Sequence, residues 1–187
     1  MKKIFLYYLL FSIFFISNSS SKIFEFEATE IEVTNDGNRI KGKKGGNAKT
    51  SDGIKIVAET FDYDKIKNIL EAYGNVLIID EIKKIEIRTN EIVYFREVEK
   101  IISRGDTSST INNNTEIFSK NVIFERNKDT IRSKDKTEII DKEKRKYKLT
   151  SFNYHIEDEI LKGTNIFIED NTSDKFFFES AIIDLKK

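Results

Sequence analysis

The side chains best suited to catalysis are sparse in this chain, which has 187 residues, one histidine and no cysteine. A nucleophile–histidine triad would have to use His155, and no Gly-x-Ser-x-Gly motif occurs to carry its nucleophile. His155 follows Tyr154 out of phase with the neighbouring apolar pair, which favours an exposed turn residue. A single histidine without cysteine also makes no zinc site of ordinary composition. We therefore expect no catalytic residue, no metal site and no cofactor.

Two other patterns could carry chemistry, and neither is specific. Carboxylates are numerous but evenly spread, so no pair is singled out for glycoside hydrolysis, which needs two of them in one cleft. Residues 42–46, Gly-Lys-Lys-Gly-Gly, resemble a phosphate loop only superficially. They lack the Gly-x-x-x-x-Gly-Lys-Ser/Thr spacing and the helix that should follow it. We interpret the segment as a hairpin or a β-bulge.

Apolar residues recur with a period of about 30 residues, which indicates stacked structural units that share one core. Five anchors are each followed by an apolar residue two positions later, an aliphatic residue after nine and a small residue after eleven. The anchors are Ile31, Phe61, Ile92, Val122 and Phe152, with Ile182 opening a sixth unit. The residues two positions later are Val33, Tyr63, Tyr94, Phe124 and Tyr154. Those nine positions later are Ile40, Leu70, Ile101, Ile131 and Leu161. Those eleven positions later are Gly42, Ala72, Ser103, Ser133 and Gly163.

The spacing within each unit predicts β-strands. Anchor and follower flank one polar residue, so they point to the same face of a strand while the polar residue points to the other. Asp36-Gly37 between two apolar runs is a strong hairpin signal. Segments 82–87 and 139–145 contain good helix formers, but no apolar stripe of helical period respects the repeat. The expected fold class is all-β, built from hairpins plus at least one further strand per unit.

Charge and export signals narrow the setting. Lys plus Arg and Asp plus Glu each total 32, which argues against a nucleic-acid partner because such a partner calls for a basic face. Lys2 and Lys3, the apolar run 4–16 and the small residues of 17–21 together predict a signal peptide over 1–21. The run is shorter than the ~20 residues that span a bilayer, so we expect cleavage, which leaves one domain over 22–187.

Residues 58–64 (Ala-Glu-Thr-Phe-Asp-Tyr-Asp) and 68–76 (Asn-Ile-Leu-Glu-Ala-Tyr-Gly-Asn-Val) resemble the OstA-like, or organic solvent tolerance, domain of bacterial lipopolysaccharide-transport and assembly proteins. A second copy of the pattern runs from Thr89 to Gly105, and the first unit echoes it through 28–31 and 46–48. The likeness is clear over about residues 24 to 110 and weakens afterwards, since Asp135 replaces the glycine and Gly163 falls early.

This resemblance implies a β-jelly roll or a twisted, half-open β-solenoid that holds lipid A acyl chains of lipopolysaccharide in an apolar groove. It also implies association with other OstA-like domains of a periplasmic bridge, strand edge to strand edge. The residues expected to line the groove are Ile31, Val33, Phe61, Tyr63, Ile92, Tyr94, Val122, Phe124, Phe152 and Tyr154.

The resemblance places the protein in the periplasm, in contact with the outer membrane through a partner or through a C-terminal barrel that this chain lacks. The chain is too short to include such a barrel, and it lacks the cysteines that often tie the soluble part to it. The resemblance therefore implies either a periplasmic-only member or the N-terminal piece of a longer outer-membrane protein. In the second case the domain over 22–187 is truncated at its C-terminal end.

Two other functions stay open at this point. A structural or adhesive exported β-repeat protein would have a filled core and no lipid groove. A β-helical enzyme such as a polysaccharide lyase would need a carboxylate, Arg or Lys cluster on an outer face, and the sequence marks no such cluster.

Overall fold

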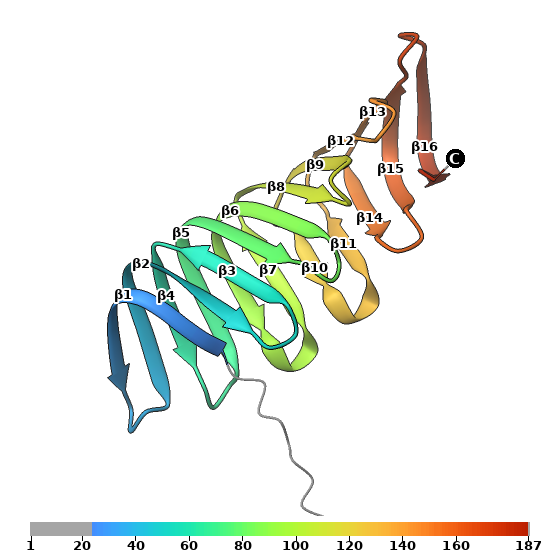
Figure 1. The fold of residues 1–187 in the computed structure, drawn as a ribbon. Helices are drawn as coiled ribbons and strands as arrows, with labels where there is room; N and C mark the ends of the chain where they lie inside the picture. The colour runs from blue at the N-terminus through green and yellow to red at the C-terminus, as the bar shows by residue number, and fades with distance from the viewer. Residues whose placement is uncertain (1–23, 187) are drawn as a thin grey trace, which may run out of the picture.

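The computed structural model of the chain describes residues 24–186, which form a single 16-stranded antiparallel sheet folded into two facing layers (Figure 1). The signal peptide predicted over 1–21 lies outside these residues. Helical structure within 24–186 is limited to two single 3-10 turns, η2 (Arg96–Val98) and η3 (Arg126–Lys128). The all-β prediction is confirmed, and segments 82–87 and 139–145 contain strand and turn.

Six long strands belong to both layers, because each bends midway: β1 (Phe24–Thr34), β2 (Arg39–Thr50), β5 (Ile69–Asp80), β6 (Ile85–Phe95), β15 (Ile160–Glu169) and β16 (Lys175–Asp184). Layer one is completed by β4 (Thr60–Asp64), β7 (Lys100–Arg104), β10 (Ile123–Glu125), β11 (Thr130–Ser133) and β14 (Ser151–His155). Layer two is completed by β3 (Ile54–Ala58), β8 (Asp106–Ile111), β9 (Thr115–Lys120), β12 (Thr137–Ile140) and β13 (Lys146–Leu149).

The two layers meet along one corner, where the long strands bend or the short strands connect. Left-handed backbone makes these bends: Gly74 and Asn75 have φ of 77° and 47°, and Gly45 has φ of 80°. The Gly-Asn-Val of residues 74–76 is therefore a β-bulge at the corner, where the register between β5 and β6 shifts. Residues 42–46 lie in β2 at its own bend, as the bulge interpretation predicts.

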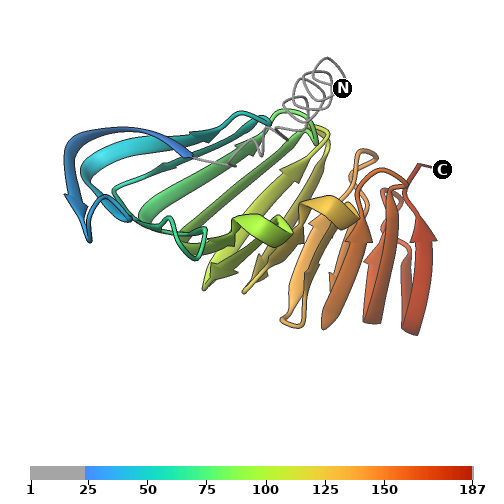
Figure 2. The same ribbon diagram turned by 90° about the horizontal axis from the view of Figure 1, so that it is seen from below.

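Opposite the corner lies the mouth, where the hairpin turns of both layers end (Figure 2). Layer one contributes the turns at 35–38, 65–68, 96–99, 126–129 and 156–159, and layer two those at 51–53, 81–84, 112–114 and 141–145. The first of these is the predicted Asp-Gly hairpin, with φ of 52° at Asp36 and 86° at Gly37. Successive turns are hydrogen-bonded to each other, for example Arg126 N to Glu99 O at 3.0 Å.

Candidate functional site: the apolar core between the layers

Residues one period apart in the sequence lie in the same row of layer one, because every second strand repeats the same position. The inner row of this layer pairs Val33 with Ile40, and Ile40 with Tyr63, and continues in the same register to the last strand. The remaining members follow in order as Leu70, Tyr94, Ile101, Phe124, Ile131, Tyr154, Leu161 and Ile183. Anchor-plus-two and anchor-plus-nine residues thus form one continuous apolar row along the layer.

A second inner row carries the anchors and the small residues in alternation. Ile31 pairs with Gly42, Gly42 with Phe61, and the row continues through Ala72, Ile92 and Ser103. Beyond Val122, whose carbonyl accepts the Ser103 N–H at 2.9 Å, the row resumes as Ser133, Phe152, Gly163 and Ala181.

The sixth anchor was expected at Ile182 and this is wrong, because Ala181 occupies its place in the second row. Ile182 pairs with Lys162 on the outer face and is exposed. A slip of one residue in register moves every side chain of a strand to the other face, so spacing alone could not assign the phase of β16.

All ten residues expected to line a groove share the inner face of layer one, but they differ in burial. Eight of them are at most 4% exposed and belong to one hydrophobic core: Phe61, Tyr63, Ile92, Tyr94, Val122, Phe124, Phe152 and Tyr154. The other two, Ile31 and Val33, are 48% and 57% exposed, since β1 is the edge strand at that end. Their contact with a lipid stays a prediction.

The small residues of the second row do not leave empty space at their two glycines. A Cβ on Gly42 would lie 3.2 Å from the ring of Phe61, and one on Gly163 would lie 2.9 Å from Leu149 Cδ1. Neighbouring core side chains therefore already fill these places.

Layer two provides the facing wall. The sequence predicts two of its strand segments, 76–79 and 85–87, which lie in β5 and β6, but not the others. Its inner positions are mostly aliphatic and buried: Ile54, Ile56, Val76, Ile78, Ile85, Ile87, Ile111, Ile117, Ile139, Leu149 and Ile166. Period-2 alternation such as Ile54-Lys55-Ile56 was the signal that could have identified the remaining segments. Hydroxyl groups also face inward. The hydroxyls of Ser103 and Thr107 are hydrogen-bonded to each other at 2.8 Å, and so are those of Ser119 and Thr137.

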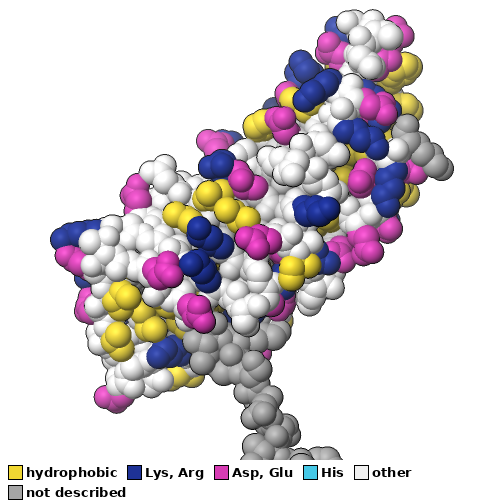
Figure 3. All heavy atoms as spheres, in the orientation of Figure 1, with side chains coloured by type: hydrophobic (Ala, Val, Ile, Leu, Met, Phe, Trp, Pro, Cys, Tyr) yellow, Lys and Arg dark blue, Asp and Glu magenta, His cyan; other side chains and the backbone are white. Residues whose placement is uncertain are grey.

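Both ends of this core carry exposed apolar side chains. At the β1 end, Phe24 packs against Tyr63 and Tyr94, with ring centroids 5.1 and 5.6 Å apart, and Ile31 and Val33 remain exposed beyond it. Figure 3 shows hydrophobic side chains at this end of the molecule, while charges of both signs are interspersed elsewhere on the same face. At the other end, Phe176 and Phe178 on the edge strand β16 are 48% and 44% exposed.

The mouth is closed by buried ion pairs that join turns of the two layers. Arg96, only 1% exposed, donates from Nη2 to Asp52 Oδ2 at 2.8 Å and from Nη1 to Glu99 Oε1 at 2.8 Å. Arg126 donates from Nε to Asp80 Oδ2 at 2.6 Å and from Nη1 to Asp52 Oδ2 at 3.1 Å. Burial lowers the pKa of Arg126, but its hydrogen bonds with Asp80 and Glu99 outweigh this and raise the pKa above its ordinary value. These residues are called the clasp below.

Sequence reasoning did not identify the clasp. Its charges come from turns far apart in the chain, and each of them has the composition of an ordinary polar turn. The one weak signal was the similar placement of Arg96 and Arg126, both of which open a turn about 30 residues apart.

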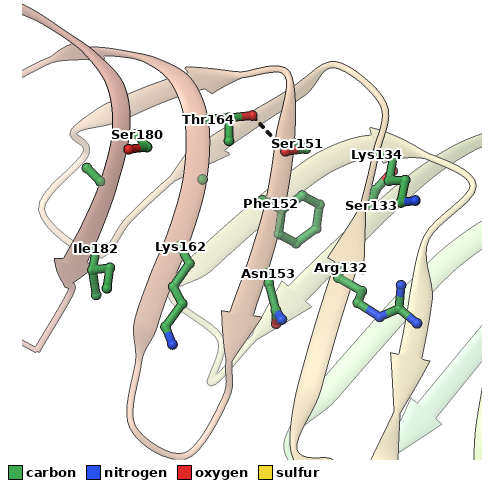
Figure 4. A pocket seen from close by; sticks show the side chains of 12 residues that line it. Arg132, Ser133, Lys134, Ser151, Phe152, Asn153, Lys162, Thr164, Ser180 and Ile182 are labelled. Carbon is green, nitrogen blue, oxygen red and sulfur yellow. Dashed lines mark hydrogen bonds between the residues drawn. The ribbon is translucent and has the colours of Figure 1, made fainter.

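One hollow lies on the outer face of layer one and not between the layers. It has a volume of about 600 Å³, and its rim comes from β11, β14, β15 and β16 (Figure 4). Arg132, Asn153, Lys162 and Ile182 line it, and Ser151 and Thr164 hydrogen-bond to each other at 2.7 Å. None of the ten predicted lining residues except Phe152 contributes to it.

His155 ends β14 at the layer-one side of the mouth and is half-buried, with Nδ1 3.3 Å from Asp158. Within residues 24–186 no three His, Cys, Asp or Glu side chains are grouped so that they could hold a metal ion. No helix in the same part of the chain is long and apolar enough to cross a membrane.

Comparison with known proteins yields likenesses in structure and none in sequence. No protein-family model matches the chain, and no curated protein matches it. Among solved structures, the chain is similar to LptH of Pseudomonas aeruginosa, described as the LptA-homologous periplasmic component of the lipopolysaccharide transport device. The identity is 10%, the match covers 84% of this chain and 94% of LptH, and the TM-score is 0.32.

Proposed function

We propose that the protein is a periplasmic lipid-binding scaffold that takes part in lipopolysaccharide transport, holding acyl chains against the inner face of layer one. The observation that carries this proposal is the continuous apolar row on the inner face of layer one. The core to which this row belongs ends in exposed apolar residues at both edge strands. In proteins built from stacked units, the terminal units that face solvent normally have a polar outer face. Here Val33 at one end and Phe178 at the other are 57% and 44% exposed.

The open strand edges support the second part of the proposal, association with like domains. Within residues 24–186, β1 pairs only with β2 and β16 only with β15, so each presents there a free edge of backbone N–H and C=O groups. Free edges recruit a further strand. Joining β16 of one domain to β1 of the next would continue both inner rows across the junction and cover the exposed ends. OstA-like domains of a transport bridge are the partners that the sequence resemblance suggests.

The competing function is a structural or adhesive exported protein, and one observation favours it. Eight of the ten lining residues are at most 4% exposed, so the core is filled in this conformation. A lipid-carrying protein must therefore separate its layers, or admit the lipid at an end, to expose them. The two functions differ in whether the core ever contacts lipid.

Site-specific photo-crosslinking to purified lipopolysaccharide tests this difference. A photoreactive phenylalanine analogue replaces Val33 at the open end or Phe124 in the middle of the first row. Phe118, on the outer face of layer two and 43% exposed, takes the same analogue as the control. Adducts at Val33 and Phe124 without adducts at Phe118 are expected. Absence of adducts at both core positions would favour the filled-core structural protein.

A further inference from the structure

The mouth runs along the core, and ion pairs close it at several places. The clasp joins the turns at 51–53 and 96–99, and through Arg126 it also joins the turn at 126–129. Next along the mouth, the ammonium of Lys83 pairs with the carboxylate of Asp129. Further on, Lys142 lies 4.0 Å from Glu159 and donates to the carbonyl of Lys186 at 2.9 Å. Each of these contacts links a turn of layer two to layer one.

One place between these contacts is open. A hollow of about 370 Å³ lies where the layer-two turns at 81–84 and 112–114 face the layer-one turns at 126–129 and 156–159. Ile82, Lys84, Asn112 and Glu157 line it together with the Lys83–Asp129 pair, and so does Ile156. Among the described residues no hydrogen bond or ion pair joins the 112–114 turn to layer one across this place.

Ile156 connects the hollow to the core. It lines the hollow, yet it is only 4% exposed and belongs to the same hydrophobic cluster as the two inner rows. On the outer side, Ile82 is 64% exposed and forms an apolar rim. An alkyl chain entering here would pass from one isoleucine to the other and would reach the core without breaking the clasp.

An unpaired ammonium at the rim offers a contact for an anionic headgroup beside such a chain. Lys84 is exposed and has no ion-pair partner among residues 24–186, and Lys83 stands next to it. Asp129 is already paired with Lys83, which leaves Glu157 as the opposing charge on the rim. An unpaired lysine beside an apolar opening suits a phosphate-bearing amphiphile, since the ammonium binds the phosphate while the chain is buried.

We infer that the hollow at Ile156 is the portal through which one acyl chain of a phosphate-bearing amphiphile enters the core, with Lys84 holding its headgroup. This inference rests on the proposed lipid-binding function and adds the route of entry, which the two open ends would otherwise provide. The clasp keeps the layers together on one side of the portal, and the Lys142 contacts keep them together on the other.

A removable tether across the mouth tests the route. The chain has no cysteine, so Lys83→Cys with Asp129→Cys introduces two unique thiols next to the portal. A short, reducible bis-thiol linker joins them. The matched control is Asp106→Cys with Lys120→Cys, an ion pair of 3.0 Å on the outer face of layer two. Uptake of fluorescent lipopolysaccharide is measured in stopped flow, and circular dichroism verifies the fold of each protein.

The tether at the portal should slow uptake at least tenfold, and reduction should restore it, while the control tether changes nothing. Equal uptake before and after reduction of the portal tether would overturn the portal and assign entry to the ends, leaving the lipid-binding function intact. Lack of uptake by every protein, including the unmodified chain, would overturn the lipid-binding function itself, and the portal with it.

Charge reversal tests the headgroup contact separately. Lys84→Glu should reduce the rate of lipopolysaccharide uptake several-fold. Lys65→Glu should not, since Lys65 is an exposed turn lysine elsewhere on the mouth with no ion-pair partner in the part of the chain that the structure describes. An equal reduction in both variants would show a general effect of charge and would contradict the role of Lys84.

Discussion

The Nε atom of Arg126 lies 2.6 Å from Oδ2 of Asp80, and this contact joins the turn after β10 in layer one to the end of β5 in layer two. Asp80 is fully buried, and its other oxygen accepts the N–H groups of Ile82 and Lys83 at 3.1 and 3.0 Å. One carboxylate therefore both shapes the turn beside the portal and binds the opposite layer.

Removing Arg126 should strongly destabilise the fold. Arg126→Gln leaves the buried Asp80 carboxylate without its cationic partner, which in such sites costs about 3–5 kcal/mol. Urea denaturation followed by circular dichroism measures the free energy of unfolding. Arg88→Gln is the control, because Arg88 pairs with Glu86 on an exposed face. It should change stability by no more than about half a kcal/mol. Equal effects of the two substitutions would mean that the clasp does not hold the layers together.

A charge on the inner side of the terminal strand should prevent association of the domains. Phe178→Lys places an ammonium at the open end of the core, where the side chain is 44% exposed and can reach water. Concentration-dependent light scattering should show association in the unmodified protein and its loss in the variant. Phe118→Lys, at a similar exposure of 43% but away from both edges, should associate normally. Association that survives Phe178→Lys would place the contact elsewhere.

The corner should tolerate a side chain at one glycine better than at another. Gly74 and Gly105 have nearly the same φ, 77° and 80°, so replacement by alanine costs each about 1 kcal/mol through its backbone. A Cβ at position 74 would also lie 2.6 Å from Glu59 Cδ, whereas a Cβ at position 105 meets nothing within 4 Å. Gly74→Ala should therefore lower the melting temperature more than Gly105→Ala does. The reverse order would refute this account of the bend.

Ionisation of the core tyrosines should be coupled to unfolding in alkali. Burial raises the pKa of Tyr94, Tyr147 and Tyr154 above the ordinary value of about 10. A raised folded-state pKa contributes stability that is fully present below pH ~10 and is lost as the pH rises further, because the unfolded chain ionises first. Tyrosinate absorbance of these three residues, isolated by comparison with a triple Phe variant, should appear together with loss of the β-sheet circular dichroism. Ionisation near pH 10 with the sheet intact would contradict their burial.

The sequence predicted the local structure well because local structure depends on neighbours along the chain. Alternation such as Phe61-Asp62-Tyr63 produces a strand with one inner face, and Asn-Asp-Gly at 35–37 favours the left-handed turn that the hairpin needs. The regular spacing also placed Tyr63, Tyr94 and Phe124 in one row, since equal units stacked in register must align equal positions. The phase of β16 escaped this reasoning, because the register of the last hairpin is set by its pairing with β15 and not by the period.

What the sequence by itself determined, then, is the all-β class, the hairpins and the shared inner face of the ten apolar residues. Only the tertiary structure decided that two layers close on each other, that eight of those residues are buried, and that Arg126 meets Asp80 across the mouth. The physical reason is the separation along the chain over which each kind of interaction acts. Strand and turn preferences act between residues a few positions apart, whereas burial and ion pairing depend on the approach of segments 46 positions apart, as for these two residues. Bends at Gly45 and Gly74 bring such segments together by folding one sheet over itself.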